Sequence, residues 1–208
     1  MISLIHPSRG RPFKARDTAK KWIESAGTKV EHILSIDADD TTAPMYDWAD
    51  YCIVGNNNSV VEATNRAAEE VSGDILLYLS DDFDCFHDWA LAIEKEVKDF
   101  PPLWLLKVDD CLQKFDVAVL TIPIMSKGLY QRLGYFWYPE YKSMFVDEDL
   151  FWTCRKLGVI HNAPHLKFEH RHASVGKAQD DETYRRSARN WDQGKELFAK
   201  RKGLGFPS

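Results

Sequence analysis

Short apolar runs alternate with stretches of helical spacing along the first half of the chain. Buried strands are expected at four of these runs, residues 2–6, 30–36, 51–54 and 75–79. Helices are expected between them and after them, at residues 13–26, 59–71 and 89–98. Ser59, with Glu62 three positions later, forms a capping box at the start of the second helix. This alternation predicts an α/β protein with a mostly parallel central sheet and helices on both faces.

The second half of the chain has a less regular pattern. It predicts one further strand at residues 117–123 and helices at 126–133, 149–157 and 181–201. The prolines at 101 and 102 mark a break between elements rather than a domain boundary. With 208 residues and no repeat, linker or low-complexity tract, residues 1–208 are expected to form a single domain.

Composition and charge narrow the classes of protein that fit. The formal net charge of −5 argues against a chain that binds nucleic acid over its whole surface. From His165 onward, ten Lys or Arg outnumber six Asp or Glu, so this segment either approaches an anionic partner or is a solvated helix and tail. Four cysteines, none in a CxxC pair, favour free thiols over a zinc site. With no signal peptide and no membrane span in the sequence, we expect a cytoplasmic protein.

The strand at 75–79 ends in an unusual acidic cluster. Ser80 is followed by three carboxylates within four residues, Asp81, Asp82 and Asp84. Like charges this close repel one another unless a positive group joins them, and a divalent cation is the natural candidate. The alternative is a solvated turn whose aspartates cap the next helix.

Two other predicted strands also end in polar side chains. Ser8, Arg9 and Arg11 follow the first strand, and Asp37, Asp39 and Asp40 follow the second. Because the carboxyl ends of parallel strands share one edge of a sheet, these groups are expected to converge on one crevice. Arginine suits phosphate, and carboxylates suit ribose hydroxyls, base N–H groups and a hard cation. The pattern therefore indicates a site for a nucleoside diphosphate. The chain has no P-loop and no GxGxxG, which removes the main support for ATPases and dinucleotide dehydrogenases.

The order and spacing of several motifs resemble the GT-A-fold glycosyltransferases of the large family-two type. The first stretch runs through Asn65-Arg66-Ala67-Ala68, Gly73-Asp74, the apolar strand and Ser80-Asp81-Asp82. The second runs through Gly134-Tyr135-Phe136, Pro139-Glu140-Tyr141 and Phe145-Val146-Asp147-Glu148-Asp149-Leu150 to Gly158. Pro7-Ser8-Arg9-Gly10-Arg11 resembles the donor loop of that family. The resemblance covers roughly residues 1–160.

The resemblance implies a Rossmann-like GT-A domain that moves a sugar from a nucleotide-diphosphate sugar to an acceptor hydroxyl with inversion. Residues 1–125 would form the nucleotide-sugar and metal half, and residues 126–208 the acceptor half with a C-terminal closing segment. The implied cofactor is Mn²⁺ or Mg²⁺, and a UDP-sugar is the foremost donor. Donor contacts would come from Pro7, Ser8, Arg9, Arg11, Asp37, Asp39, Asn65 and Asp81.

The metal motif fits the chain in two registers. In one, Ser80 stands where the family has its first Asp and Asp82 is the last; in the other, Asp82-Phe83-Asp84 is the motif. Asp82 is needed in both, with Asp81 and Asp84 as flanking candidates. The resemblance implies a downstream histidine ligand, His172 or else His170. These two histidines are two positions apart and would lie on the same face of a strand. Arg171 and Lys177 could meet the diphosphate or could simply be solvated.

The implied catalytic base is Asp147 or Asp149, depending on how the helix before Gly158 is matched. Alternatively, these acids have only a structural role, in which their negative charge interacts favourably with the positive N-terminus of that helix. Phe136, Trp137 and Tyr138 precede the base and form the candidate acceptor site, although packing over the sheet would explain them equally well.

The acceptor itself stays open among a glycan, a small molecule, a protein and a modified DNA base. A nucleotidyltransferase, or a nucleotide-sugar-binding protein without turnover, is the alternative function.

Overall fold

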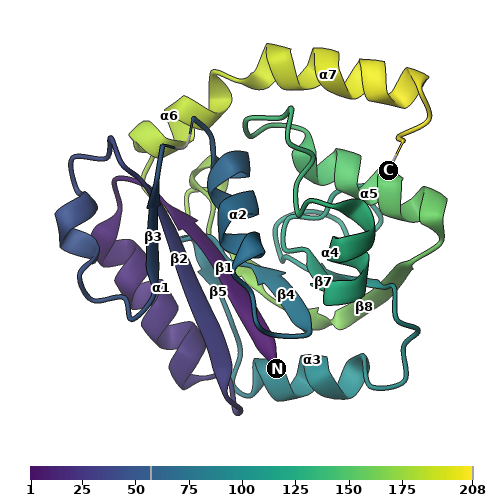
Figure 1. Cartoon of the computed structure of the whole chain (residues 1–208), viewed down its shortest axis with the longest axis horizontal. Helices are drawn as coiled ribbons and strands as arrows, with labels where there is room; N and C mark the ends of the chain where they lie inside the picture. Colours follow the sequence, from purple (N-terminus) through teal and green to yellow (C-terminus); the bar gives the residue numbers. More distant parts are fainter. Residues whose placement is uncertain (57, 208) are drawn as a thin grey trace.

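A seven-stranded sheet forms the centre of the computed structural model, which describes residues 1–56 and 58–207 (Figure 1). The strands lie in the order β3-β2-β1-β4-β7-β6-β8. Their bounds are β1 (Ile2–Ser8), β2 (Val30–Asp37), β3 (Cys52–Gly55), β4 (Ile75–Tyr78), β6 (Leu105–Asp109), β7 (Ile124–Ser126) and β8 (Ile160–Lys167). Strands β3, β2, β1 and β4 run parallel, with Ile5 of β1 level with Ile33 of β2 and Tyr78 of β4. Strand β7 is antiparallel to both of its neighbours, β4 and β6.

Helices cover both faces of the sheet, as the sequence predicts. Ile5, Leu76 and Leu105 point into a core shared with α2 (Val60–Glu69), α4 (Lys127–Leu133) and α5 (Val146–Leu157). Leu4, Leu77 and Leu106 point to the opposite face, where α1 (Pro12–Glu24) and α3 (Trp89–Glu96) pack. Because both faces of β1 are covered, all of its residues are buried, which explains a continuous apolar run rather than an alternating one.

Local signals in the sequence place the first helices correctly. Pro12 occupies the first turn of α1, where its missing N–H costs no hydrogen bond. The Ser59 side chain accepts from the backbone N of Glu62 at 3.1 Å and so caps α2. These contacts confirm the expected helix starts to within a residue or two.

The second half of the chain departs from the prediction. Residues 117–123 form no strand; they belong to a loop, and the chain enters the sheet only at β7, after Pro123. Strands β6 and β8 were not predicted, although Leu105 and Leu106 at the start of β6 are fully buried. The expected helix at 181–201 is two helices, α6 (Glu182–Ala188) and α7 (Trp191–Gly203), which meet at Arg189 and Asn190.

A small two-stranded ribbon links the acidic cluster to the C-terminal part of the chain. Strand β5 (Phe83–Asp84) pairs antiparallel with β9 (Glu169–His170), so that Phe83 lies opposite His170. The pairing brings the histidine segment beside the end of β4. Two short 3₁₀ turns, Ala43–Tyr46 and Ala173–Val175, complete the elements. Among the described residues, no helix combines the length and apolar character needed to cross a membrane.

Candidate active site

A cavity of about 440 Å³ opens at the carboxyl edge of the parallel strands. Its size is in the ordinary range for small-molecule sites. The strand ends, the N-termini of α2 and α5, the β9 segment and α6 all contribute to its wall. Of the residues singled out from the sequence, the wall contains Pro7, Ser8, Arg9, Arg11, Asp37, Asp81, Asp82, Trp137, Asp147, His170 and His172.

Asp82 lies deep in this cavity with both carboxylate oxygens engaged. Oδ1 accepts from the Ser80 hydroxyl at 2.7 Å. Oδ2 accepts from the Tyr184 hydroxyl at 2.6 Å and lies 3.2 Å from Nε2 of His170. Burial alone would raise the pKa of Asp82, but the His170, Ser80 and Tyr184 contacts hold it well below its usual range. Asp82 is therefore ionised at neutral pH.

Asp81 is buried beside Asp82 but has partners of its own. Its Oδ1 lies 2.9 Å from Nε2 of His6, and its Oδ2 accepts from the Ser8 hydroxyl at 3.0 Å. The Arg11 guanidinium lies 3.9 Å away. His6 is itself held by His32, with ring nitrogens 3.0 Å apart. These contacts fix the Asp81 carboxylate rigidly against β1.

Asp84 does not face the cavity. Its carboxylate pairs with Lys21 of α1 and with Arg171, and it accepts from the backbone N of Cys85 at 2.9 Å. Arg171 and Lys177 also pair with Glu169, so neither reaches the cavity. The expectation that Asp84 shares a cation with Asp82 is therefore wrong for this structure, because the ribbon β5–β9 turns Asp84 toward other cations.

Asp82 and His170 fit a divalent cation held partly by substrate. Cis ligands of an octahedral Mg²⁺ lie about 3 Å apart, close to the 3.2 Å between these two side chains. The Nδ1 atom of His170 is buried and has no hydrogen-bond partner among the described residues. The His172 ring lies 5.0 Å from the His170 ring. Burial lowers the pKa of His172, which favours its neutral form at pH 7. No three His, Cys, Asp or Glu gather into a complete metal site within the described part of the chain, so phosphate and water would have to supply the remaining ligands.

Arg9 and Arg11, which follow β1, also line the cavity. Arg9 donates to Asp37 at 2.6 Å and also pairs with the exposed Asp39. The hydrogen bond that Arg9 donates to Asp39 raises the pKa of Arg9. Asp40 accepts from the backbone N of Gly10 at 2.7 Å and so anchors the loop after β1. Asp37 lines the cavity and Asp39 does not.

The two candidate bases lie in different surroundings. Asp147 lines the cavity from the first turn of α5, and burial raises its pKa, with the charge of Asp110 adding to the effect. Asp149 is 1% exposed and turned away from the cavity. It accepts from Arg201 at 2.6 Å and from the Tyr141 hydroxyl at 3.0 Å. The expectation for Asp149 as a base is corrected, since this buried ion pair leaves it no access to a substrate.

Comparison with solved structures identifies the fold. TarS from S. aureus matches with a TM-score of 0.62 at 13% identity over 81% of this chain and 59% of its own. A mannosyltransferase from Pyrobaculum calidifontis, solved with GDP-Man and Mn²⁺, matches with a TM-score of 0.65 at 13% identity over 81% and 56%. Glucosyl-3-phosphoglycerate synthase from Mycobacterium tuberculosis, solved with Mg²⁺ and UDP, matches with 0.61 at 16% identity over 85% and 74%. The chain has the GT-A glycosyltransferase fold.

The predicted GT-A fold is thereby confirmed at the level of structure. At the level of sequence, no family model and no curated protein matches this chain. The chain spans less than three fifths of the length of TarS and of the mannosyltransferase, so each of those proteins has substantial parts outside the shared domain.

Asn65, a residue on which the GT-A resemblance depends, holds a loop rather than lining the cavity. Its Oδ1 accepts from the backbone N of Phe136 at 3.1 Å and of Trp137 at 2.8 Å. Its Nδ2 donates to the carbonyl of Trp137, also at 2.8 Å. Asn65 therefore positions the aromatic loop and does not contact the cavity, which corrects its expected role in donor binding.

The aromatic loop contributes less to the cavity than expected. Phe136 is fully buried in the core, and the Tyr138 ring covers the Arg201 guanidinium at 3.5 Å. Trp137 alone of the three lines the cavity. The alternative of packing over the sheet is correct for Phe136 and Tyr138.

Residues of the GT-A cavity that sequence reasoning missed lie on α6 and on the turn before α5. Tyr184 and Arg186 come from α6, and Phe145 adopts a left-handed conformation (φ 68°) just before Asp147. Positive φ is uncommon for a bulky residue and often marks a functional turn. The signals for α6 in the sequence were the helical pattern over residues 181–201 and the basic character of the C-terminal segment, and neither placed its side chains in the cavity.

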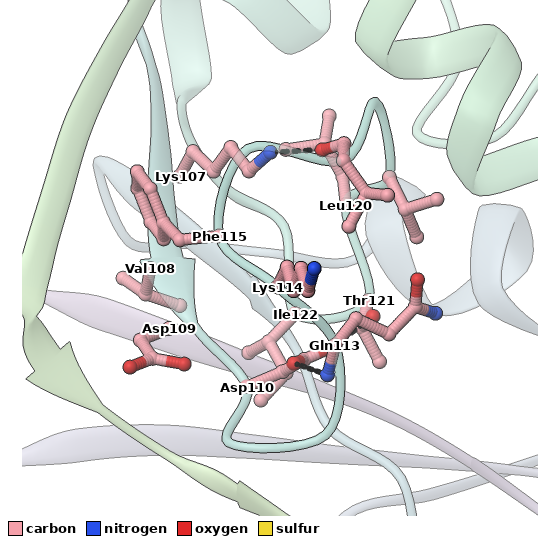
Figure 2. A pocket seen from close by; sticks show the side chains of 12 residues that line it. Lys107, Val108, Asp109, Asp110, Gln113, Lys114, Phe115, Leu120, Thr121 and Ile122 are labelled. Carbon is pink, nitrogen blue, oxygen red and sulfur yellow. Dashed lines mark hydrogen bonds between the residues drawn. The ribbon is translucent and has the colours of Figure 1, made fainter.

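A second, much smaller cavity of about 20 Å³ lies under the loop that follows β6 (Figure 2). It has room for roughly one water molecule. The Lys107 ammonium donates to the carbonyl of Val117 and lies 5.1 Å from the Phe115 ring centre, and burial lowers its pKa. These contacts fold the loop whose residues Leu112, Gln113 and Thr121 line the large cavity, so this small cavity has a structural role.

Proposed function

We propose that this protein is a metal-dependent glycosyltransferase that moves a sugar from a nucleotide-diphosphate sugar to an acceptor hydroxyl with inversion. The observation that carries the proposal is that one cavity contains the Asp82–His170 pair, two arginines and Asp147. Solved proteins with the same fold carry GDP-Man with Mn²⁺, or UDP with Mg²⁺. A UDP-sugar or GDP-sugar donor is thus the first choice for a test.

The donor would lie between the two arginines and the metal-binding pair. Asp37, buried at the end of β2, would accept hydrogen bonds from the base or ribose, while Arg9 and Arg11 would face the diphosphate. Asp82 and His170 would hold the cation, with Asp81 and Ser80 fixing the end of β4. Bound there, the cation would supply Lewis-acid stabilisation of the departing nucleoside diphosphate.

Asp147 would act as the general base. Its carboxylate would accept the proton of the acceptor hydroxyl while the acceptor oxygen bonds to the anomeric carbon and the bond from that carbon to the diphosphate breaks. Its raised pKa suits proton abstraction near neutral pH better than an ordinary carboxylate would. Trp137 and Phe145 also line the cavity and would offer apolar surface to the acceptor.

The test begins with binding and then measures turnover. UDP-, GDP- and ADP-sugars are screened for thermal stabilisation of the protein with and without Mn²⁺. Nucleoside diphosphate release from the stabilising donor is then measured for wild type, Asp147→Asn and Glu148→Gln. Glu148 is the matched control because it is adjacent to Asp147 but does not line the cavity.

We expect Mn²⁺-dependent stabilisation by at least one donor and release that Asp147→Asn reduces by about 10²-fold or more, while Glu148→Gln retains it. Stabilisation by no nucleotide sugar would remove the proposal. Binding with release that is undetectable with every acceptor class tried would leave a nucleotide-sugar-binding protein instead.

A further inference from the structure

Helix α6 lies over the carboxyl ends of β1 and β2 (Figure 1), and its residues Thr183, Tyr184, Arg186 and Ser187 line the large cavity. None of its residues is buried, and residues 176–181 before it are exposed or half-buried as well. Apolar burial therefore contributes little to its position, and polar contacts with the cavity wall determine where it lies. An element held in this way is among the first to open in a native protein.

The strongest of these contacts joins Asp181 to Arg11. Nε and Nη2 of Arg11 each donate to one oxygen of the Asp181 carboxylate at 2.7 Å. This two-pronged edge is the one with which arginine binds phosphate. Arg11 is only 9% exposed and its guanidinium stacks on the Tyr184 ring at 4.4 Å. Asp181 thus occupies the edge of Arg11 that a diphosphate would use.

Tyr184 makes the corresponding contact with Asp82. Its hydroxyl donates to Oδ2 of Asp82 at 2.6 Å, on the same oxygen that faces His170. A cation bound to that oxygen would lie about 2.0–2.6 Å from it, in the space that the hydroxyl proton points into. The hydroxyl and a cation therefore compete for Oδ2.

Weaker contacts also hold α6. The Thr183 hydroxyl donates to the backbone carbonyl of Arg9 at 3.0 Å, and Arg186 lies 3.8 Å from Asp37. The Ser143 hydroxyl donates to the carbonyl of Ser187 at 3.1 Å, and the Tyr184 ring lies 4.7 Å from the His172 ring. All of these partners of α6 line the cavity.

We infer that α6 is an internal occupant of the donor site, with the Asp181 carboxylate in place of a phosphate on Arg11 and the Tyr184 hydroxyl in place of the cation on Asp82. Binding of a nucleoside diphosphate and its metal exchanges these contacts and releases α6 from its docked position. The inference rests on the proposed donor site, and it adds that the chain restrains its own affinity for donor and metal.

Two conservative substitutions remove the competing groups and little else. Asp181 also caps α6, accepting from the backbone N of Thr183 at 3.0 Å and of Tyr184 at 3.2 Å, and Asp181→Asn keeps an oxygen for that cap. Tyr184→Phe keeps the ring under Arg11. Matched controls are Asp180→Asn, whose exposed carboxylate pairs with Arg185, and Tyr130→Phe on α4, outside the cavity.

The readouts are affinity and exposure rather than turnover. Calorimetry gives the Kd of UDP and of GDP without metal, and thermal stabilisation with the better nucleotide gives the Mn²⁺ concentration at half effect. If the docked form holds about nine tenths of the molecules, Asp181→Asn binds the nucleotide about tenfold more tightly. Tyr184→Phe lowers the Mn²⁺ concentration at half effect, and both controls match wild type. Amide hydrogen exchange across residues 178–190 becomes faster when wild type binds nucleotide and Mn²⁺.

The possible results distinguish a failure of this inference from a failure of the proposed donor site. The inference is overturned if wild type binds the nucleotide, Asp181→Asn binds it with unchanged or weaker affinity, and Tyr184→Phe has an unchanged Mn²⁺ concentration at half effect. The proposed donor site is then unaffected. Failure of UDP, GDP and every nucleotide sugar of the thermal screen to bind wild type or any variant overturns the donor site and the inference with it.

Discussion

Replacing Asp149 with Asn tests whether this carboxylate is structural, as its surroundings indicate. Asp149 and Arg201 are 1% and 3% exposed, and the guanidinium donates to both carboxylate oxygens at 2.6 and 3.1 Å. The amide of Asp149→Asn keeps the shape and can still accept from Tyr141, but it leaves the buried Arg201 without its counter-charge. Breaking a buried ion pair on one side costs about 3–5 kcal/mol.

That loss is a large part of the stability of a domain, which is about 5–15 kcal/mol in total. For a chain of this size it lowers Tm by roughly 6–20 °C. Urea unfolding followed by tryptophan fluorescence measures the free energy of unfolding. The control is Glu148→Gln at the half-buried neighbouring position, which is expected to stay within about 0.5 kcal/mol of wild type. The double variant Asp149→Leu/Arg201→Met should recover part of the loss, because no buried charge is then left unpaired. A loss below about 1 kcal/mol in Asp149→Asn, or a fully stable Asp149→Asn protein without turnover, would refute the structural role.

Three further predictions follow from single contacts. Burial raises the pKa of Asp147 above its usual value of 3.8, and the base is active only when deprotonated, so donor turnover should fall as the pH drops through this pKa. A pH–rate profile measures this effect, and turnover that stays constant on the acid side would contradict it. Asn65→Ala removes three hydrogen bonds to the backbone of the aromatic loop and should cost roughly 2–4 kcal/mol in urea unfolding, whereas a change within 0.5 kcal/mol would show that the loop holds itself. Gly194→Ala would place a Cβ 2.5 Å from the carbonyl of Met144, so we expect a lower Tm and a weaker donor affinity through the shifted cavity wall, measured against Gly203→Ala, where nothing lies within 4 Å.

The parallel half of the sheet was predictable because its signals are local. Each of its strands is a short, mostly apolar run that ends at a polar cluster, and a cap such as Ser59 fixes where the next helix starts. Strands β6 and β8 are paired with each other across a long separation in the chain, with Leu105 opposite Ile160. Their pairing depends on tertiary context, and the apolar residues Leu120 and Ile122 in the nearby loop gave a misleading strand signal because they are buried without joining the sheet.

The same contrast divides the site. Residues at the ends of β1, β2 and β4 could be placed at one edge of the sheet from topology alone, and Arg9, Asp37 and Asp82 do meet there. Tyr184 reaches Asp82 from 102 positions away along the chain. No spacing rule covers such a contact, because the two residues lie in elements that pack through polar groups rather than through an apolar pattern.

The three carboxylates after β4 show why charge repulsion alone was an incomplete guide. Aspartates this close need a shared cation only if nothing else offsets their charge, and in the fold each of them has partners of its own. Asp81 faces His6 and Ser8, whereas Asp84 faces Lys21 and Arg171. Their repulsion is relieved without a metal, so the cluster is not evidence for one. A more specific observation favours a cation. Of the three aspartates, Asp82 is the one that contacts a histidine of the cavity wall, His170, and its other partner on the same oxygen is the Tyr184 hydroxyl, from a helix with no buried residue. The metal hypothesis therefore depends on whether that hydroxyl can leave.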